Sequence, residues 1–206
     1  MDAREKTRQL LEESQQRRSY RKFLDEPVDL DVIRDCIRIA GTAPSGANKQ
    51  PWHFCLVTNQ EWKDRIRKES DETEKKFYES LITEAWASDL DVLNLSWEKP
   101  FLNEAPCLIV IFREFYKTLE DGTKDTNYYV MESAAIATGL LINALRNAGY
   151  ASLTYTPAPT TFLKEMFDRP EGEQCEMVLV VGKPDPEYDL PDIDRKSYDE
   201  IVTEYL

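Results

Sequence analysis

The sequence predicts a domain of the α+β or α/β class, because strand-like and helix-like segments alternate along it. Residues 108–112 are a short, wholly apolar run that is typical of a buried strand, and residues 151–155 and 177–182 are predicted as further strands. Residues 128–148, rich in Ala, Ile and Leu, form the most apolar predicted helix. The chain has 206 residues, so we expect a single domain over residues 1–206.

Three further elements are predicted from their ends and their periodicity. In residues 29–40, Asp29 is a suitable N-cap, apolar side chains recur at helical spacing, and Gly41 ends the helix. A polar helix is predicted over residues 3–16 and a strand over residues 53–57. These elements place the loop of residues 42–51, which contains Gly, Pro and Asn, between a helix and a strand.

Residues 60–98 are highly charged and carry large apolar residues at irregular helical spacing. This pattern is typical of two helices that cover a site rather than form a deep core. The apolar residues in question are Phe77, Tyr78, Leu81, Trp86, Leu90, Leu93 and Trp97. The helix over residues 128–148 is apolar on more than one face, so it is either fully buried or half-buried in a subunit contact. Residues 184–206 are expected to form an acidic, extended C-terminal extension.

The charge balance excludes two kinds of partner. The chain has 26 Lys and Arg residues against 39 Asp and Glu residues, a net charge of −13. Nucleic-acid binding needs a basic face, and anionic membranes attract basic segments, so neither partner is expected. No run approaches the roughly 18 apolar residues of a membrane span, so no membrane association is expected.

Histidine and cysteine usage argues against a metal site. The four cysteines (Cys36, Cys55, Cys107 and Cys175) are far apart, and His53 is the single histidine. Zinc is therefore not expected, and His53 is interpreted as a packing residue. The cysteines are interpreted as reduced thiols, which indicates a cytoplasmic protein.

The common catalytic and nucleotide-binding motifs are missing. A Ser-His-Asp or Cys-His set has only His53 to draw on, and neither G-x-x-x-x-G-K nor G-x-G-x-x-G occurs. An enzyme of this composition often takes its chemistry from an organic cofactor. The sequence therefore directs attention to segments that can bind one.

Two segments are candidates for cofactor binding. Residues 17–21, Arg-Arg-Ser-Tyr-Arg, place three arginines in an otherwise acidic chain, and arginine forks bind phosphate oxygens in pairs. Residues 43–52, Ala-Pro-Ser-Gly-Ala-Asn-Lys-Gln-Pro-Trp, are small enough to let backbone approach a flat ligand. Taken alone, the first is better interpreted as a solvated charge run, and the second as an ordinary helix-to-strand loop.

Taken together, the two segments resemble the nitroreductase-like flavoproteins, and within them the branch of the iodotyrosine deiodinases. The similarity extends through Glu104-Ala-Pro106, Asn147-Ala-Gly149, Thr154-Tyr-Thr-Pro157 and Arg195-Lys196 to nearly the whole chain. This resemblance implies an α+β fold with a mixed central sheet flanked by helices. It also implies a domain-swapped homodimer with two FMN sites at its interface.

The resemblance assigns cofactor-binding roles by motif. The FMN phosphate and ribityl chain would be held by Arg17, Arg18, Ser19, Arg21 and Arg195. Pro44, Ser45 and Gly46 would approach the flavin from the second subunit, and Thr154, Tyr155 and Thr156 would lie over its ring system. The Thr156 hydroxyl would face flavin N5, where a hydrogen bond favours stepwise electron transfer to a carbon–halogen bond. Thr156 is therefore the expected catalytic residue.

The deiodinase branch also implies a substrate site under a mobile lid, here residues 68–100. Glu74 and Lys99 would pair with the ammonium and the carboxylate of a halotyrosine, and Tyr78 would hydrogen-bond to either group. Glu74 and Tyr78 are four residues apart, so they share a helix face. The backbone amide of Ala47 would bind the phenolate. Without the resemblance, residues 68–80 are simply a charged, solvated helix.

These assignments predict an FMN-dependent dehalogenase that converts 3-iodotyrosine and 3,5-diiodotyrosine to tyrosine and iodide. The electron donor is expected to be NAD(P)H, acting directly or through a reductase. A broader NAD(P)H-dependent nitroreductase or quinone reductase is the alternative, although its acceptors lack an amino-acid head. A flavin-binding protein without turnover is the third reading.

Overall fold

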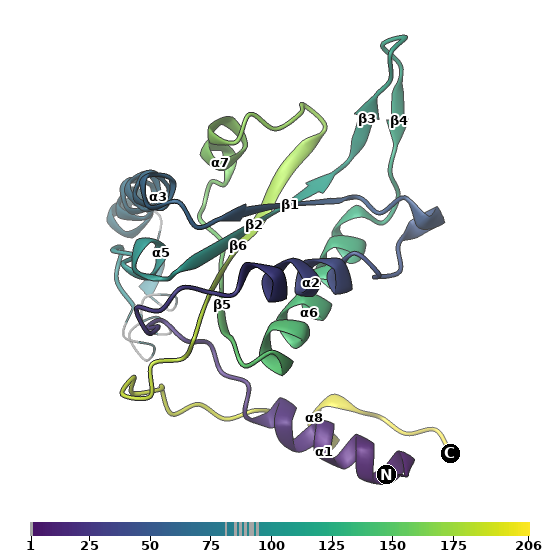
Figure 1. The fold of residues 1–206 in the computed structure, drawn as a ribbon, viewed down its shortest axis with the longest axis vertical. Helices are drawn as coiled ribbons and strands as arrows, with labels where there is room; N and C mark the ends of the chain where they lie inside the picture. Colours follow the sequence, from purple (N-terminus) through teal and green to yellow (C-terminus); the bar gives the residue numbers. More distant parts are fainter. Residues whose placement is uncertain are drawn as a thin grey trace.

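The computed structural model describes residues 2–80, 82–84, 86, 88, 90, 93 and 95–206 (Figure 1). Its centre is a four-stranded sheet in the order β1-β2-β6-β5. The strands are β1 (Trp52–Val57), β2 (Cys107–Glu114), β5 (Ala151–Tyr155) and β6 (Glu173–Gly182). All three pairings within this sheet are antiparallel.

The expected mixed sheet is therefore antiparallel among the described strands. Among the described residues, a parallel pairing occurs only as an isolated bridge between Ser19 and Ser152, at the edge strand β5. The Tyr20 amide donates a hydrogen bond of 3.4 Å to the carbonyl of Ser152 at this bridge. Because residues 17–21 contribute one bridge rather than a strand, they do not make the sheet mixed. The bridge nevertheless lays the basic segment alongside β5.

Helices cover both faces of the sheet (Figure 1). One face carries α2 (Leu30–Ala40) and α6 (Val130–Asn147). The other carries α3 (Gln60–Ser80), α5 (Phe101–Glu104) and α7 (Thr161–Met166). Side chains alternate along β2, so that Leu108, Val110 and Phe112 pack toward the second group while Ile109 and Ile111 pack toward the first. Two cores result, one on each side of the sheet.

Most elements predicted from the sequence are confirmed. In α2 the Asp29 carboxylate accepts hydrogen bonds from the amides of Asp31 and Val32, and Gly41 is the C-cap. The polar N-terminal helix is α1 (Ala3–Gln15), and the first helix predicted within residues 60–98 is α3. The second predicted helix and Leu81 fall where residues 81, 85, 87, 89, 91, 92 and 94 lie outside the described residues.

Several short elements were not predicted. They are η1 (Gly46–Asn48), β3 (Tyr116–Thr118), β4 (Lys124–Thr126), α5, α7 and α8 (Tyr198–Ile201). Strands β3 and β4 form a hairpin that projects from the body of the molecule (Figure 1). The tail, predicted as extended, contains α8 near its end and runs close to α1 (Figure 1).

Helix α6 is buried on one side and exposed on the other. Met131 and Ile136 are 56% and 45% exposed, whereas Ala134, Ala137 and Leu141 are fully buried. Of the two alternatives that the sequence left open, full burial within this chain is wrong. Further exposed apolar side chains lie on α1 and in the tail, namely Leu10, Leu11, Tyr198, Ile201 and Tyr205. Among the described residues, no helix combines the length and the hydropathy needed to cross a membrane.

Candidate active site

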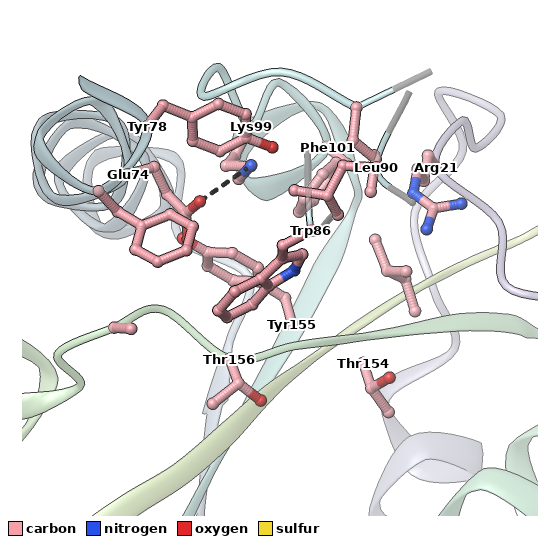
Figure 2. Close-up of a pocket in the computed structure, with 14 residues that line it drawn as sticks. Arg21, Glu74, Tyr78, Trp86, Leu90, Lys99, Phe101, Thr154, Tyr155 and Thr156 are labelled. Carbon is pink, nitrogen blue, oxygen red and sulfur yellow. Dashed lines mark hydrogen bonds and ion pairs between the residues drawn. The ribbon is translucent and has the colours of Figure 1, made fainter. Parts of the chain in front are cut away.

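A pocket opens between β5, α3 and the segment that leads into α5 (Figure 2). It brings Glu74, Tyr78 and Lys99 together with Thr154 and Thr156. Its walls are apolar and partly aromatic, formed by Phe77, Trp86, Leu90, Leu95, Phe101, Leu153 and Ala158. The pocket therefore suits a ligand with an aromatic body and a charged end.

Glu74 and Lys99 form a buried ion pair at this pocket (Figure 2). The Lys99 Nζ lies 3.2 Å from Glu74 Oε2, and the two side chains are 6% and 12% exposed. The same Nζ donates a hydrogen bond to the carbonyl of Ser96 and lies 5.2 Å from the centroid of the Tyr78 ring. Buried charges are costly unless paired, so each of these groups compensates the other's burial.

Helix α3 positions the segment that carries Lys99 through contacts on successive turns. The Lys63 ammonium donates to the carbonyl of Ala105 at 2.7 Å, and Arg67 donates to the Asn103 side chain at 2.8 Å. One turn later, Asp71 accepts a hydrogen bond of 2.7 Å from the backbone amide of Lys99. Lys63, Arg67 and Asp71 are four residues apart along α3, so their side chains share one helix face. Burial lowers the pKa of Lys63.

Strand β5 supplies the opposite wall of the pocket. Thr154 and Thr156 are exposed toward the pocket, and their hydroxyls make no hydrogen bond with any described residue. Tyr155, between them, is 7% exposed and packs edge-on against Phe101, with ring centroids 5.6 Å apart. Its hydroxyl donates a hydrogen bond of 3.2 Å to Glu74 Oε1. Burial, with the nearby Glu74 carboxylate, raises the pKa of Tyr155.

The basic segment forms a second pocket that shares Arg21 with the first. Its lining includes Arg17, Arg18, Ser19 and Arg195. Arg195, from the tail, donates hydrogen bonds of 2.7 and 2.5 Å to the carbonyls of Gln15 and Arg17. Arg18 donates to the carbonyl of Pro191.

These arginines crowd one another, and Asp194, the one acidic residue among the described residues that line this pocket, is not ion-paired with any of them. Burial, together with the positive charges of Arg195, Arg146 and Arg18, lowers the pKa of Arg17. None of them forms an ion pair with an acidic side chain of the described residues. In a chain with a net charge of −13, such a cluster is the electrostatic environment of an anion. Arg146 was not singled out from the sequence.

The two pockets, which share Arg21 in their linings, fit FMN, the cofactor expected from the sequence. A phosphate suits the unpaired arginines, and a flat ring system suits the exposed hydroxyls of Thr154 and Thr156. Arg21 lies between the two, because the bridge of Ser19 with Ser152 carries the basic segment along β5. No group of His, Cys, Asp and Glu side chains among the described residues is arranged to hold a metal ion.

The loop between α2 and β1 lies away from this pocket. Pro44, Ser45, Gly46 and Ala47 line neither pocket, and the loop lies beside the β3–β4 hairpin, opposite α3 and α5 (Figure 1). A lysine of this loop is ion-paired to the hairpin, with 2.6 Å between the Nζ and the carboxylate of Asp125. Within one chain the structure therefore does not join these four residues to the others.

The backbone of this loop is nevertheless unusual. Ala47 has φ +49°, in the left-handed region that few non-glycine residues adopt, and its amide makes no hydrogen bond with any described residue. A Cβ on Gly46 would lie 2.7 Å from a ring carbon of Tyr129, so the close packing at this point requires glycine. The loop thus holds a free backbone donor in a fixed position, which is a common property of binding loops.

One interpretation of the sequence is wrong, and two features of the site were not predicted from it. His53 is exposed on β1 and does not line the pocket, so its interpretation as a packing residue is wrong. Asp71 and the Tyr155–Glu74 hydrogen bond were missed. Residues 71, 74 and 78 have helical spacing, so Asp71 was identifiable as a neighbour of Glu74. Strand alternation places Tyr155 opposite to Thr154 and Thr156.

The chain belongs to the nitroreductase family, whose model matches residues 15–183. Among curated proteins it is 41% identical to an iodotyrosine deiodinase of Haliscomenobacter hydrossis, over 92% of this chain and 85% of that one. It is 36% identical to an iodotyrosine deiodinase of Nematostella vectensis, over 98% and 76% of the two chains.

Solved structures agree with this family. A crystal structure of oxidized iodotyrosine deiodinase bound to FMN and 3-iodo-L-tyrosine matches with a TM-score of 0.82 and 31% identity, over 96% of this chain and 98% of that one. A BluB-like flavoprotein from Clostridium difficile matches with a TM-score of 0.72 at 19% identity, a likeness of fold alone.

Proposed function

We propose that this chain is an FMN-dependent reductive dehalogenase that converts 3-iodotyrosine and 3,5-diiodotyrosine to tyrosine and iodide. One observation carries the proposal: a buried Glu74–Lys99 pair closes one end of an aromatic-walled pocket, opposite the free hydroxyls of Thr154 and Thr156. A negative and a positive group side by side complement the zwitterionic head of an amino acid. The similarity to iodotyrosine deiodinases supports this substrate class.

The cofactor-binding residues follow from the two pockets that share Arg21. Arg17, Arg18 and Arg195, with Ser19, would hold the phosphate of FMN, and Arg21 would contact the chain between phosphate and ring. Thr154 and Thr156 would face the flavin ring, with the Thr156 hydroxyl toward N5. The side chain of Tyr155 packs into the core, so its cofactor-binding role is limited to the backbone.

The substrate-binding residues follow from the ion pair. Glu74 would bind the ammonium and Lys99 the carboxylate, so the incoming head replaces one internal pair by two pairs with the ligand. Tyr78, whose ring lies beside the Lys99 Nζ, would hydrogen-bond the same head. The free amide of Ala47, from a second copy of the chain, would bind the phenolate oxygen. Residues 68–100 would act as a lid, and their closure excludes water from the pocket.

The chemistry is a two-electron reduction. Reduced FMN, when bound at these residues, would supply the two electrons and the proton that replace the carbon–iodine bond by a carbon–hydrogen bond and release iodide. The side chains bind the zwitterion, orient the ring and donate hydrogen bonds; none is required as a nucleophile.

The site is proposed to be completed in a homodimer. Pro44, Ser45, Gly46 and Ala47 lie too far from the pocket of their own chain to contribute to it, so they would serve the pocket of the second copy. The exposed apolar face of α6 offers a surface for such a contact. We further propose a cytoplasmic location, supported by four free cysteines, with NAD(P)H as electron donor, acting directly or through a reductase.

An anaerobic turnover assay tests the proposal. FMN-loaded protein is kept reduced with excess dithionite, mixed with excess 3-iodotyrosine and analysed by chromatography, with free reduced FMN as the control. We expect tyrosine and iodide in molar excess over protein. A protein that holds and reduces FMN but yields no tyrosine contradicts the proposal. Oxidation of NADPH by nitroaromatics, in a protein without halotyrosine affinity, supports a general nitroreductase.

A further inference from the structure

The hydroxyl of Tyr155 joins the strand side of the site to the helix side. Tyr155 lies in the backbone between Thr154 and Thr156, the residues proposed to face the flavin. Its hydroxyl reaches across to α3 and donates a 3.2 Å hydrogen bond to Glu74 Oε1. No other described side chain of β5 is hydrogen-bonded to α3.

The two oxygens of Glu74 have different partners. Oε1 accepts from Tyr155, and Oε2 lies 3.2 Å from the Lys99 Nζ. Because Oε1 is held by the Tyr155 hydroxyl, the Glu74 carboxylate cannot rotate to place both of its oxygens against the Lys99 Nζ. Because burial raises the pKa of Tyr155, its hydroxyl stays a neutral donor over the whole range in which enzymes are assayed.

We infer that Tyr155 is a positioning residue for substrate recognition, whose hydroxyl fixes the Glu74 carboxylate so that Oε2 is presented to the ammonium of the amino-acid substrate. This inference rests on the proposed function. Without the hydroxyl, Glu74 can turn toward Lys99, and the ligand must break a stronger internal pair. Removing the hydroxyl therefore lowers the affinity for ligands that carry an amino-acid head and leaves the affinity for other ligands unchanged.

Tyr155→Phe tests the inference, because it removes the hydroxyl and keeps the ring that packs against Phe101. Dissociation constants are measured by flavin fluorescence on oxidised, FMN-loaded protein, and KM and kcat in the anaerobic assay. We expect the Kd and KM for 3-iodotyrosine to rise about ten-fold, the value of one hydrogen bond to a charged group. Changes in kcat, FMN affinity and 2-iodophenol affinity stay within about two-fold.

Tyr150→Phe is a matched control. Tyr150 is also buried, at 9% exposure, and its hydroxyl accepts a 2.9 Å hydrogen bond from the Asp29 amide, on the other face of the sheet. The Tyr150→Phe substitution removes a buried hydroxyl that does not contact Glu74. It is expected to leave the Kd for 3-iodotyrosine within about two-fold of the wild type.

A double-mutant cycle with Glu74→Gln shows whether Tyr155 acts through Glu74. We expect Tyr155→Phe to change the Kd less than about two-fold in the Glu74→Gln background. An equal effect in both backgrounds, no effect in the wild type, or a parallel loss of 2-iodophenol affinity overturns the inference. If wild-type protein does not bind 3-iodotyrosine, the proposed function itself fails, which is a distinct result.

Discussion

Replacing Glu74 by glutamine tests whether the pocket recognises an amino-acid head. The change keeps the size of the side chain and removes the charge that lies 3.2 Å from the Lys99 Nζ. Two unit charges at that distance attract by about 5 kcal/mol when the effective dielectric constant is near 20. Only part of this is lost from ligand affinity, because Lys99 already engages the carboxylate in the ligand-free protein and the ammonium must compete for it.

We therefore expect a loss of about 2–3 kcal/mol, the lower part of the range for removing one partner of a buried charge pair. This corresponds to a Kd for 3-iodotyrosine about 30- to 150-fold higher. The assay is a titration of 3-iodotyrosine into oxidised, FMN-loaded protein, followed by flavin fluorescence. Binding of 2-iodophenol, which lacks the charged head, is measured beside it and is expected to change little.

Glu79→Gln is the matched control, since Glu79 lies on the same helix, is 64% exposed and does not line the pocket. It makes the same change of charge and is expected to bind 3-iodotyrosine like the wild type. The reasoning is refuted if Glu74→Gln binds 3-iodotyrosine as tightly as Glu79→Gln does. It is also refuted if the variant loses FMN while retaining its affinity for the amino acid.

Three other predictions concern the phosphate site, the buried thiols and the subunit contact. Arg17→Ala is expected to weaken FMN binding about ten-fold or more and to leave riboflavin binding, which involves no phosphate, nearly unchanged; equal losses for both flavins speak against a phosphate site. Burial raises the pKa of the Cys107 thiol to about 12 from 9.0. Above pH 9 the unfolded state therefore loses a proton that the folded state retains. The free energy of unfolding should fall as the pH rises from 9 to 12, by about 1.4 kcal/mol per pH unit for this thiol. Denaturation at several pH values should show a shallower fall for Cys107→Ala, and an identical slope contradicts the assignment. Ile136→Glu, on the exposed face of α6, is expected to give monomers with weakened FMN binding, measured by light scattering and flavin titration; a dimer that binds FMN normally places the contact elsewhere.

Local signals were enough to predict the four sheet strands and the long helices that build most of the core, although α5 and α7, which contribute Leu102 and Leu163, were missed. Helix α2 was predicted because its cap, its apolar stripe and its terminal glycine are contiguous in the sequence, and the Asp29 cap is confirmed. The β3–β4 hairpin was missed because its strands are three residues long and polar. A signal was nevertheless present in Asp121-Gly122, where Gly122 has φ +82° and an Asp-Gly pair favours a turn.

The candidate site was predicted less completely from the sequence than the fold was. Glu74 and Tyr78 share a helix face that spacing alone reveals, but the pairing of Glu74 with Lys99 depends on how α5 packs against α3. That packing rests on contacts between distant residues, such as Lys63 with the carbonyl of Ala105. Only the resemblance to a family supplied the connection before the structure did.

The parallel or antiparallel pairing of the strands was also not predictable from local sequence signals. Pairing direction is set by how segments far apart in the chain meet, and the resemblance led us to expect a mixed sheet. The described strands are antiparallel, with one parallel bridge at Ser19. That bridge matters for the proposed function, because it places the arginines of residues 17–21 beside the edge strand that carries Thr154.

The central claim is that this pocket directs reductive dehalogenation by recognising the amino-acid head of a halotyrosine. The most direct test compares anaerobic turnover of 3-iodotyrosine and 2-iodophenol by dithionite-reduced, FMN-loaded protein. We predict catalytic formation of tyrosine and iodide, with a kcat/KM for 2-iodophenol lower by at least the factor of about 30 expected from losing the Glu74 contact. Equal values for the two substrates, or no tyrosine from a protein that holds and reduces FMN, would contradict it.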